Sequence, residues 1–359
     1  MKKFIFLLVV IIAFNSCVTE NNKYSNKIVF EMFFMENNQI ETEEMYFLLL
    51  KDENTFSLNA YINSEITEFR VFTVSEGSLI TTDKKDRVVI IDTSNNAIII
   101  HCIHTFKETK LSIPYNITPK TIFLSSENIF IGGTIGEELL IQYHIQSDSW
   151  YKLDIPEEVT FWGKAIDDLV VSDNFLIAVD NMMLPKYALF YHINPNGKLL
   201  FSHFRELKSN GAYEEIHQGR ISHKYLGIYS NTFSGYTGPS EHITIYKGID
   251  LISSFAISMK TSREHNFQII NDFLIIQDKL FIAHKINGLG IFEIKDLYFT
   301  VSQGRFDIFN QRVDENNINY FQYVNEEILR LTLIPNENKI ILTIRNVSGN
   351  IRYEIKELD

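Results

Sequence analysis

Three aromatic residues lie in or beside one glycine- and serine-rich stretch, residues 230–241, which reads S-N-T-F-S-G-Y-T-G-P-S-E. Tyr229 directly precedes the stretch, and Phe233 and Tyr236 lie within it. Aromatic rings on an adaptable glycine–serine backbone are typical of binding surfaces, where they stack on a sugar or contact a peptide. The sequence therefore predicts a binding loop here, with a loop that has no ligand as the alternative. Ser234 is not expected to be a nucleophile, because no G-x-S-x-G elbow surrounds it.

Carboxylates are the second group with possible chemistry. Adjacent acids occur at Asp167-Asp168 and at Glu214-Glu215, and glycoside hydrolysis uses two carboxylates on either side of the bond to be cleaved. The sequence alone does not place either pair in space, so no catalytic residue is assigned. Asp180 and Trp162 are further candidates for contact with a ligand, although packing within the fold explains the tryptophan equally well.

Metal and cofactor chemistry is not expected. Cys102 and His104 in the run H-C-I-H share one face of a strand, but two ligands do not make a metal site, and no CxxC or HExxH motif follows. The glycine-rich run at 132–136 joins two predicted strands. Because a phosphate cradle requires a helix after the glycines, this run is predicted to be a turn.

The elements that must position these residues are short β-strands. Runs such as 88–91 (V-V-I-I), 98–100 (I-I-I) and 340–342 (I-I-L) are β-branched and bounded by turn residues. They are apolar on both faces instead of alternating, which is typical of strands whose sheet is covered on both sides. The chain is therefore predicted to be all-β.

A short hairpin pattern recurs along the chain. It appears at 74–81, 125–132, 171–178, 221–228, 276–283 and 324–331, with Glu76, Glu127, Asp173, His223, Asp278 and Glu326 at its turn. A period of about fifty residues with four strands per unit indicates the blade of a β-propeller. Residues 28–67 lack the pattern and are predicted to form a divergent seventh blade, with six blades plus an N-terminal closing segment as the alternative. Several β-sandwich domains are the rival architecture.

The predicted connections differ in length. Turns within units are tight, whereas longer links occur at 107–120, 156–167, 205–220, 259–266 and 304–317, together with the irregular stretch 230–241. In propellers the longer connections emerge on one face around the centre of the ring. Function usually lies in long loops on a rigid scaffold, so this face is the expected binding surface.

The N-terminal sequence predicts where in the cell the protein is located. Residues 1–16 contain two lysines and then an apolar run too short to span a bilayer, which is the pattern of a secretory signal. The following cysteine, Cys17, ends a stretch that resembles the lipobox of bacterial lipoproteins, although Phe14 and Asn15 depart from that pattern. The resemblance implies lipidation of Cys17, a flexible tether at 17–27 and a β-propeller domain at 28–359, held in the bacterial cell envelope on the periplasmic side or the cell surface.

Composition limits the partners. The formal net charge of −12 argues against a nucleic-acid ligand, which requires a basic surface. The chain as a whole resembles a bacterial lipoprotein with a β-propeller domain, and it matches no propeller subfamily from which catalytic residues could be transferred. The expected function is binding or scaffolding of a protein, peptide or glycan through the long-link face. A carbohydrate-active enzyme, a glycosidase or lyase, is the alternative.

Overall fold

The computed structural model describes most of the chain after residue 27. The described residues are 28–34, 45–52, 55–62, 65–73, 75, 77–83, 87–102, 105, 107–125, 127–134, 139–153, 155, 165–172, 175–180, 186–194, 198–207, 214–222, 224–234, 238–248, 253–260, 269–301, 312–334 and 338–358. The predicted signal at 1–16, the tether and Cys17 lie outside these residues. No helix within them has the length and apolar character needed to cross a membrane.

The strands form seven sheets in chain order. The first holds β1 (Ile28–Phe34), β2 (Met45–Asp52), β3 (Thr55–Ile62) and β4 (Glu65–Thr73), and the second holds β5 (Leu79–Thr82), β6 (Arg87–Asp92), β7 (Ala97–Cys102) and β8 (Glu108–Ser112). The third holds β9 (Thr118–Ser125), β10 (Asn128–Thr134), β11 (Leu140–His144) and β12 (Ser149–Lys152). The fourth holds β13 (Ile166–Ser172), β14 (Phe175–Asp180), β15 (Lys186–Ile193) and β16 (Leu199–Leu207).

The last three sheets depart from this regular pattern. The fifth holds β17 (Glu214–Ile221), β18 (Tyr225–Ser234), β19 (Gly238–Lys247) and β20 (Ser253–Lys260), to which β24 (Thr300–Val301) and β25 (Arg312–Asp314) are added. The sixth holds β21 (Ile270–Ile276), β22 (Lys279–His284), β23 (Gly288–Glu293) and β26 (Asn319–Phe321). The seventh has three strands, β27 (Glu326–Leu333), β28 (Lys339–Asn346) and β29 (Ile351–Glu357).

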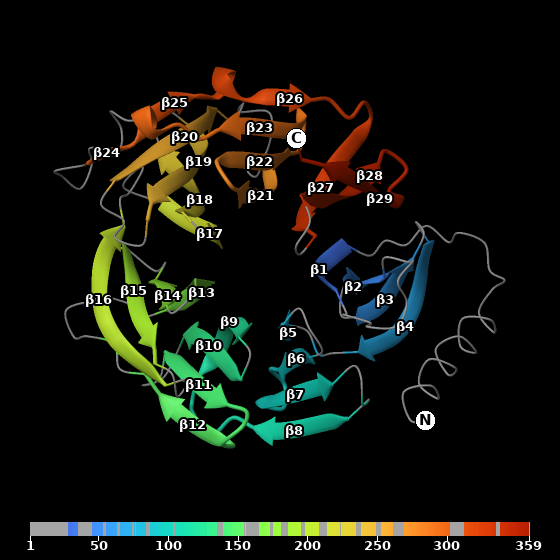
Figure 1. Cartoon of the computed structure of the whole chain (residues 1–359), viewed down its shortest axis with the longest axis vertical. Helices are drawn as coiled ribbons and strands as arrows, with labels where there is room; N and C mark the ends of the chain where they lie inside the picture. Colours follow the sequence, from blue (N-terminus) through green and yellow to red (C-terminus); the bar gives the residue numbers. More distant parts are fainter. Residues whose placement is uncertain are drawn as a thin grey trace.

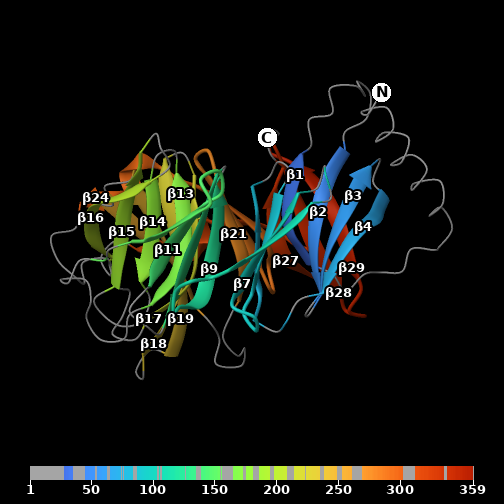
Figure 2. The ribbon, with the colours of Figure 1, turned by 90° about the horizontal axis from the view of Figure 1, so that it is seen from below.

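The seven sheets are arranged in a ring, with the first strand of each sheet nearest the centre (Figure 1). We call these strands, β1, β5, β9, β13, β17, β21 and β27, the inner ring. The first and last sheets are neighbours, because β1 contacts β27, and Figure 2 shows β1–β4 beside β27–β29. Each of these two sheets is built entirely from its own end of the chain. The ring therefore closes by packing, without exchange of strands.

The core lies between successive sheets. Residues 88–91 are at most 1% exposed, and residues 340–342 are buried to the same extent, so the prediction of strands covered on both faces is confirmed. Between the sixth and seventh sheets, Phe281 and Leu289 pack with Ile328 and Leu342. Similar apolar clusters join the second sheet to the third, the third to the fourth and the fifth to the sixth, as stacked blades require.

The recurring hairpin was predicted correctly for four of its six copies. The turn lies between the first and second strands of the third, fourth, fifth and sixth sheets. The prediction is wrong at Glu76 and Glu326, because position 76 lies between β4 and β5, and Glu326 begins β27. A turn-rich segment that joins two sheets has the same local composition as a turn within one sheet.

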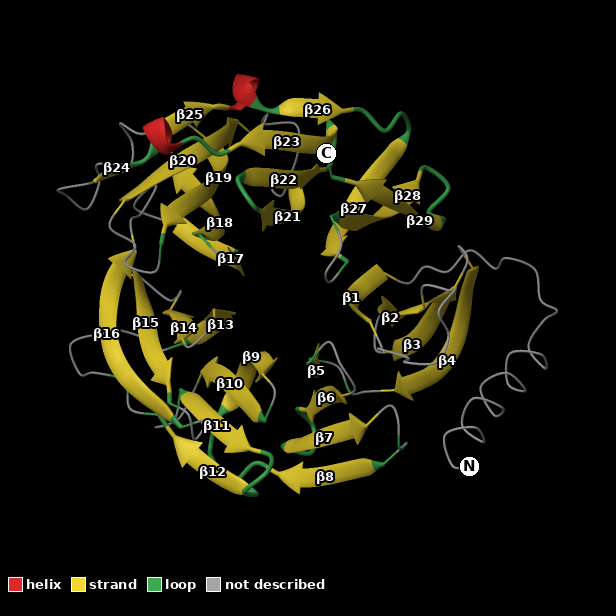
Figure 3. Cartoon of the chain, in the orientation of Figure 1, coloured by secondary structure: helices red, strands yellow, loops and turns green. Residues whose placement is uncertain are grey.

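The predicted inter-unit link at 304–317 is also wrong. After β23 the chain passes through a 3-10 turn, η2 (Asp296–Tyr298), and returns to the fifth sheet. There β24 pairs antiparallel and β25 pairs parallel with β20. A second 3-10 turn, η4 (Glu315–Asn317), leads back to β26, and these two turns are the helices drawn in Figure 3. The segment therefore lies within the sixth sheet's own connection and covers the outer edge of the fifth.

Candidate functional site

A β-bulge recurs on the inner ring. In six of its seven strands one extra residue interrupts the register with the second strand: Phe30, Lys120, Asp167, His217, Asn271 and Leu329. Each bulge lies one to three residues after the start of its strand, at the end that receives the link from the preceding sheet. The register of β5 is continuous. Bulges re-aim side chains and occur often beside functional sites.

The residues at the bulges divide the inner ring into two arcs. Four consecutive strands, β9, β13, β17 and β21, place Lys120, Asp167, His217 and Asn271 at this level. The next two strands, β27 and β1, place Leu329 and Phe30 there. These strands are neighbours in the ring. The polar and apolar residues are therefore segregated around the centre of the ring, near the face from which the inter-sheet links emerge. We call this face the link face.

The bulge on β21 holds the bulge on β27. The amide nitrogen of Asn271 donates to the carbonyl of Ile328 at 2.8 Å and to Oε1 of Glu327 at 3.0 Å. The buried carboxylate of Asp272 accepts from the backbone N–H of Leu331 at 3.0 Å and from Nη2 of Arg220 at 3.1 Å. Both sides of the β27 bulge are thereby bonded to β21. Asp272 also connects β17 to β27, so three successive strands of the inner ring are joined by one carboxylate.

A second buried carboxylate fixes the start of β21. Glu241, on β19, is 1% exposed and accepts hydrogen bonds from the backbone N–H groups of Ile269 at 2.7 Å and Ile270 at 3.0 Å. The hydroxyl of Tyr229 donates to the same carboxylate at 2.8 Å. Several donors compensate the loss of hydration of a buried carboxylate. Glu241 therefore holds the sixth sheet against the fifth beside the bulge at Asn271.

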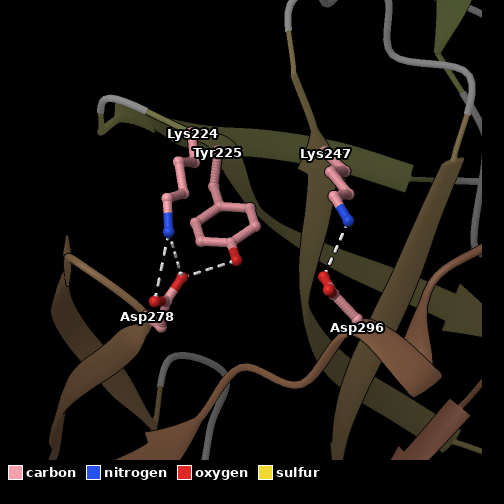
Figure 4. Close-up of polar contacts among 5 residues, drawn as sticks. All are labelled: Lys224, Tyr225, Lys247, Asp278 and Asp296. Carbon is pink, nitrogen blue, oxygen red and sulfur yellow. Dashed lines mark hydrogen bonds and ion pairs between the residues drawn. The ribbon is translucent and has the colours of Figure 1, made fainter.

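The opposite face carries ion pairs between neighbouring hairpin turns (Figure 4). Asp278 accepts from Nζ of Lys224 at 3.2 Å and from the hydroxyl of Tyr225 at 2.7 Å, and Nζ of Lys247 donates to Asp296 at 2.7 Å. The hydrogen bond from Tyr225 is the main cause that lowers the pKa of Asp278. Burial first, and then this bond, raise the pKa of Tyr225. The lysines and aspartates are about half exposed or more, so we assign these contacts to sheet packing.

The equivalent pair between the second and third sheets joins Nη2 of Arg87 to Oε1 of Glu127 at 2.9 Å. Glu127 and Asp278 are two of the turn residues that the sequence repeat aligned. Their acidic character is explained by an ionic contact to the preceding sheet.

The prediction that 230–241 is an irregular binding loop is wrong for most of its length. Residues 225–234 and 238–247 form β18 and β19, which pair from Tyr225↔Lys247 to Ser234↔Gly238. Tyr229 lies in β18, is 5% exposed and is bonded to Glu241, so its role in the structure is internal. Its neighbours in sequence favoured a loop, but aromatic and β-branched residues between the serines and glycines stabilise a strand.

The other predicted binding residues are only partly placed. Phe233 pairs with Pro239 in the same hairpin. Asp180 ends β14 opposite Ile166, directly before the bulge at Asp167, so it lies at the level of the polar arc. Tyr236, Trp162 and the lipidation residue Cys17 lie outside the described residues. The glycine-rich run was predicted to be a turn, but Gly132 and Gly133 lie inside β10.

The sequence analysis missed Lys120, His217 and Asn271. The available signal was their spacing: each lies six or seven residues before a turn residue that the repeat had aligned, as Asp167 does. Within the described part of the chain, no group of three or more His, Cys, Asp or Glu side chains is arranged to hold a metal ion.

No protein-family model matches the chain, and no curated protein matches it. Solved structures match in fold. The β-propeller domain of Cps50 (Swd1) from Myceliophteria thermophila is 9% identical, with 92% of this chain and 99% of that chain covered and a TM-score of 0.55. This chain has a β-propeller fold. A virginiamycin B lyase from Staphylococcus aureus is 11% identical over 95% of this chain and 98% of its own, with a TM-score of 0.54. A KlHsv2 variant is 10% identical over 93% and 100%, with a TM-score of 0.51.

Proposed function

We propose that this protein is a lipid-anchored, seven-bladed β-propeller that binds a protein, peptide or glycan at its link face in the bacterial cell envelope. The main support for choosing the link face is the position of the bulges. The bulges of the inner ring lie at the ends of the strands nearest this face, and they bring polar residues of four successive sheets to one level. Polar residues at one level of rigid neighbouring strands are the arrangement from which a binding site can be built.

The arrangement of the sheets supports a count of seven blades. Seven antiparallel sheets surround one centre, and the first and last are in contact. The seventh has three described strands, which is enough to cover the sixth and to meet β1. Each sheet is therefore proposed as one blade.

Binding is favoured over catalysis by the register of the acidic pair. Asp167 and Asp168 occupy on β13 the positions that Asn271 and Asp272 occupy on β21. Asn271 and Asp272 bind the backbone of the neighbouring strand. The same positions on β13 suit a structural role toward β17, so the pair does not require a catalytic explanation.

Affinity capture tests the binding function. The full-length protein is used as bait in detergent extracts of the cell envelope, beside a variant whose β18–β19 hairpin ends at the pair Thr232↔Ser240. A control variant, Gln146→Ala with Ser147→Ala, alters the β11–β12 turn on the opposite face. We expect a partner that is retained by the wild type and the control and lost by the shortened hairpin. Identical partners for all three proteins would contradict binding through this part of the link face.

The lipid anchor is tested separately. Metabolic labelling with a palmitate analogue should label the wild type and leave Cys17→Ser unlabelled. The Cys17→Ser variant should then move from the detergent phase to the aqueous phase on phase separation. Equal partitioning of both proteins would exclude lipid attachment at this residue.

A further inference from the structure

We propose that the turns at the link-face ends of the sixth and seventh sheets rest on the lipid bilayer, with Ile286, Val324 and Val347 in contact with its surface. This inference rests on the lipid anchor of the proposed function and adds the orientation in which the anchored propeller lies. It concerns the turns of these two sheets, whereas the β18–β19 hairpin belongs to the fifth.

Three aliphatic side chains project from these turns into solvent. Val347 is 82% exposed, Val324 is 76% exposed and Ile286 is 53% exposed. The two valines are the most exposed large apolar residues in the described part of the chain. A single exposed apolar side chain needs no explanation, but several of them on neighbouring turns indicate a surface that contacts another apolar phase.

Val324 and Val347 extend from the same end of the seventh sheet. The ladder between β27 and β28 ends at the pair Glu326↔Asn346. Val324 lies two residues before Glu326, in the link from the sixth sheet, and Val347 directly follows Asn346, in the turn between β28 and β29. Both valines therefore lie just beyond one end of the ladder, on the link face.

The turn that holds Ile286 lies next to this end of the seventh sheet. It joins β22 to β23, and Gly288 at the start of β23 packs so closely against the backbone carbonyl of Phe321 that a Cβ would collide with it. Phe321 ends β26 and lies three residues before Val324. The sixth and seventh sheets also share an apolar core. The three aliphatic side chains therefore belong to adjacent turns of one face.

Hydrogen bonds fix the shape of these turns. Nδ1 of His284 accepts the N–H groups of Ile286 at 3.1 Å and Asn287 at 3.0 Å. In the turn between β28 and β29, Oδ1 of Asn346 accepts the N–H group of Ser348 at 3.0 Å. A turn that is already ordered loses little conformational entropy when it meets a surface.

The carboxylates at the start of β27 are paired with arginines. Glu326 accepts hydrogen bonds from Nε and Nη2 of Arg352 at 2.9 and 2.7 Å, and Glu327 accepts one from Nη2 of Arg345 at 2.6 Å. Lys285, in the turn between β22 and β23, is exposed. These charges repel an anionic lipid surface less than the net charge of −12 for the whole chain would suggest.

The position of the anchor selects the bilayer as the partner. β1 begins at the link face and contacts β27, so the chain from Cys17 reaches the fold beside the seventh sheet. Ile28 follows Cys17 by eleven residues, which extend to at most about 40 Å. The anchor therefore holds these turns at a high effective concentration relative to the lipid surface. Three aliphatic side chains are then enough to set an orientation, because the anchor supplies the attachment.

The test uses the full-length lipidated protein in vesicles of phosphatidylethanolamine and phosphatidylglycerol. In a Cys102→Ser background, Val347→Cys or Leu297→Cys carries a nitrobenzoxadiazole label, and nitroxide-labelled lipids quench a label that touches the bilayer. Leu297 is the matched control, because it is 75% exposed in η2 on the opposite face. We expect a loss of about half or more of the fluorescence at position 347 and a loss of less than about a tenth at position 297.

A second variant tests the surface without changing the labelled position. With the label on Ile286→Cys, the double substitution Val324→Asp and Val347→Asp should reduce quenching at least about twofold. Flotation with the vesicles should not change, because the anchor is intact. Leu297→Asp is the control and should leave the quenching unchanged. Thermal unfolding should give similar midpoints for these proteins, because exposed positions contribute little to stability.

The outcomes separate this inference from the anchor itself. Equal quenching at positions 347 and 297, in a protein that floats with the vesicles, overturns the orientation alone and leaves the anchor in place. A Cys17 without lipid overturns both. A dimer of the Cys17→Ser protein that Val347→Asp dissociates would assign the turns to a second copy of the chain and would also overturn the inference.

Discussion

The carboxylate of Asp272 lies 3.0 Å from the backbone nitrogen of Leu331, and this hydrogen bond joins the inner strands of two different sheets. The same carboxylate binds Arg220 of a third sheet. Successive inner strands belong to different sheets and do not pair with each other through backbone hydrogen bonds. Buried polar side chains therefore add directional contacts to the apolar packing between sheets.

Asp272→Asn should destabilise the fold strongly. The amide keeps the shape but removes the charge that Arg220 faces, and it turns an N–H group toward one of the donors. We expect a loss of about 3 kcal/mol in the free energy of unfolding, measured with urea. Asp296→Asn removes a carboxylate that is 81% exposed and should change stability by less than about 0.5 kcal/mol. Equal effects of the two substitutions would show that Asp272 does not join the sheets.

Glu241 and Tyr229 should contribute different amounts to the free energy of unfolding. Tyr229→Phe removes one hydrogen bond and should cost about 1 kcal/mol. Glu241→Gln replaces an acceptor of three hydrogen bonds by a group with one acceptor and one donor, and should cost about 2 to 3 kcal/mol. Hydrogen exchange at Ile269 and Ile270 is the matching local measurement. Faster exchange is expected in the glutamine variant, and unchanged exchange at both amides would argue against this role of Glu241.

Gly133→Ala should also destabilise the protein. A Cβ at this position would collide with the backbone carbonyl oxygen of Thr118 and approach Ile117 at 2.8 Å, because the bulge at Lys120 brings β9 close to β10. We expect a loss of about 1 to 3 kcal/mol, typical of overpacking. Thr134→Ala, on the next residue of the strand, introduces no such collision and is the control. A stable Gly133→Ala protein would mean that β9 can shift without loss of packing.

His284 predicts a dependence of stability on pH. Burial lowers its pKa from 6.5 to about 4, and its Nδ1 accepts the N–H groups of Ile286 and Asn287 at 3.1 and 3.0 Å. Between these two pKa values the unfolded chain binds a proton at this residue and the folded chain does not. The contribution of His284 to the free energy of unfolding should therefore be fully present above pH 6.5. It should fall as the pH decreases toward 4, by up to about 3 kcal/mol.

Urea unfolding of the wild type and of His284→Phe across this range checks the sign. The phenylalanine variant removes the titrating group, so its stability should depend less on pH between 6.5 and 4. A steeper dependence in the variant would contradict the assignment. Carboxylates that titrate near pH 4 affect both proteins and cancel in the comparison.

Much of the architecture could be predicted from short-range patterns. The run at 88–91 is apolar on both faces because its sheet is covered on both sides, and this property is visible in four residues. The acidic turn residues Glu127 and Asp278 recur at a fixed spacing because each meets a cation of the preceding sheet. Glu76 and Glu326 matched the same local pattern, but their segments join two sheets, and local composition does not distinguish the two cases.

The site could not be predicted in the same way. A bulge is a property of two paired strands, since it appears only when the register of β13 with β14, or of β21 with β22, is known. Lys120 and Asn271 share a spacing before an aligned turn, but that spacing shows no bulge until the strand pairing is known. The return of β24 and β25 to the edge of β20 is likewise a long-range pairing, and such pairings depend on the whole fold.

The contact of β1 with β27 has a consequence for biosynthesis. The ring closes by joining the earliest and the latest sheets to leave the ribosome. Contacts of such large sequence separation form slowly, and domains of this length expose strand edges while they are incomplete. The chain must therefore be protected from aggregation until its last sheet, β27–β29, has been synthesised.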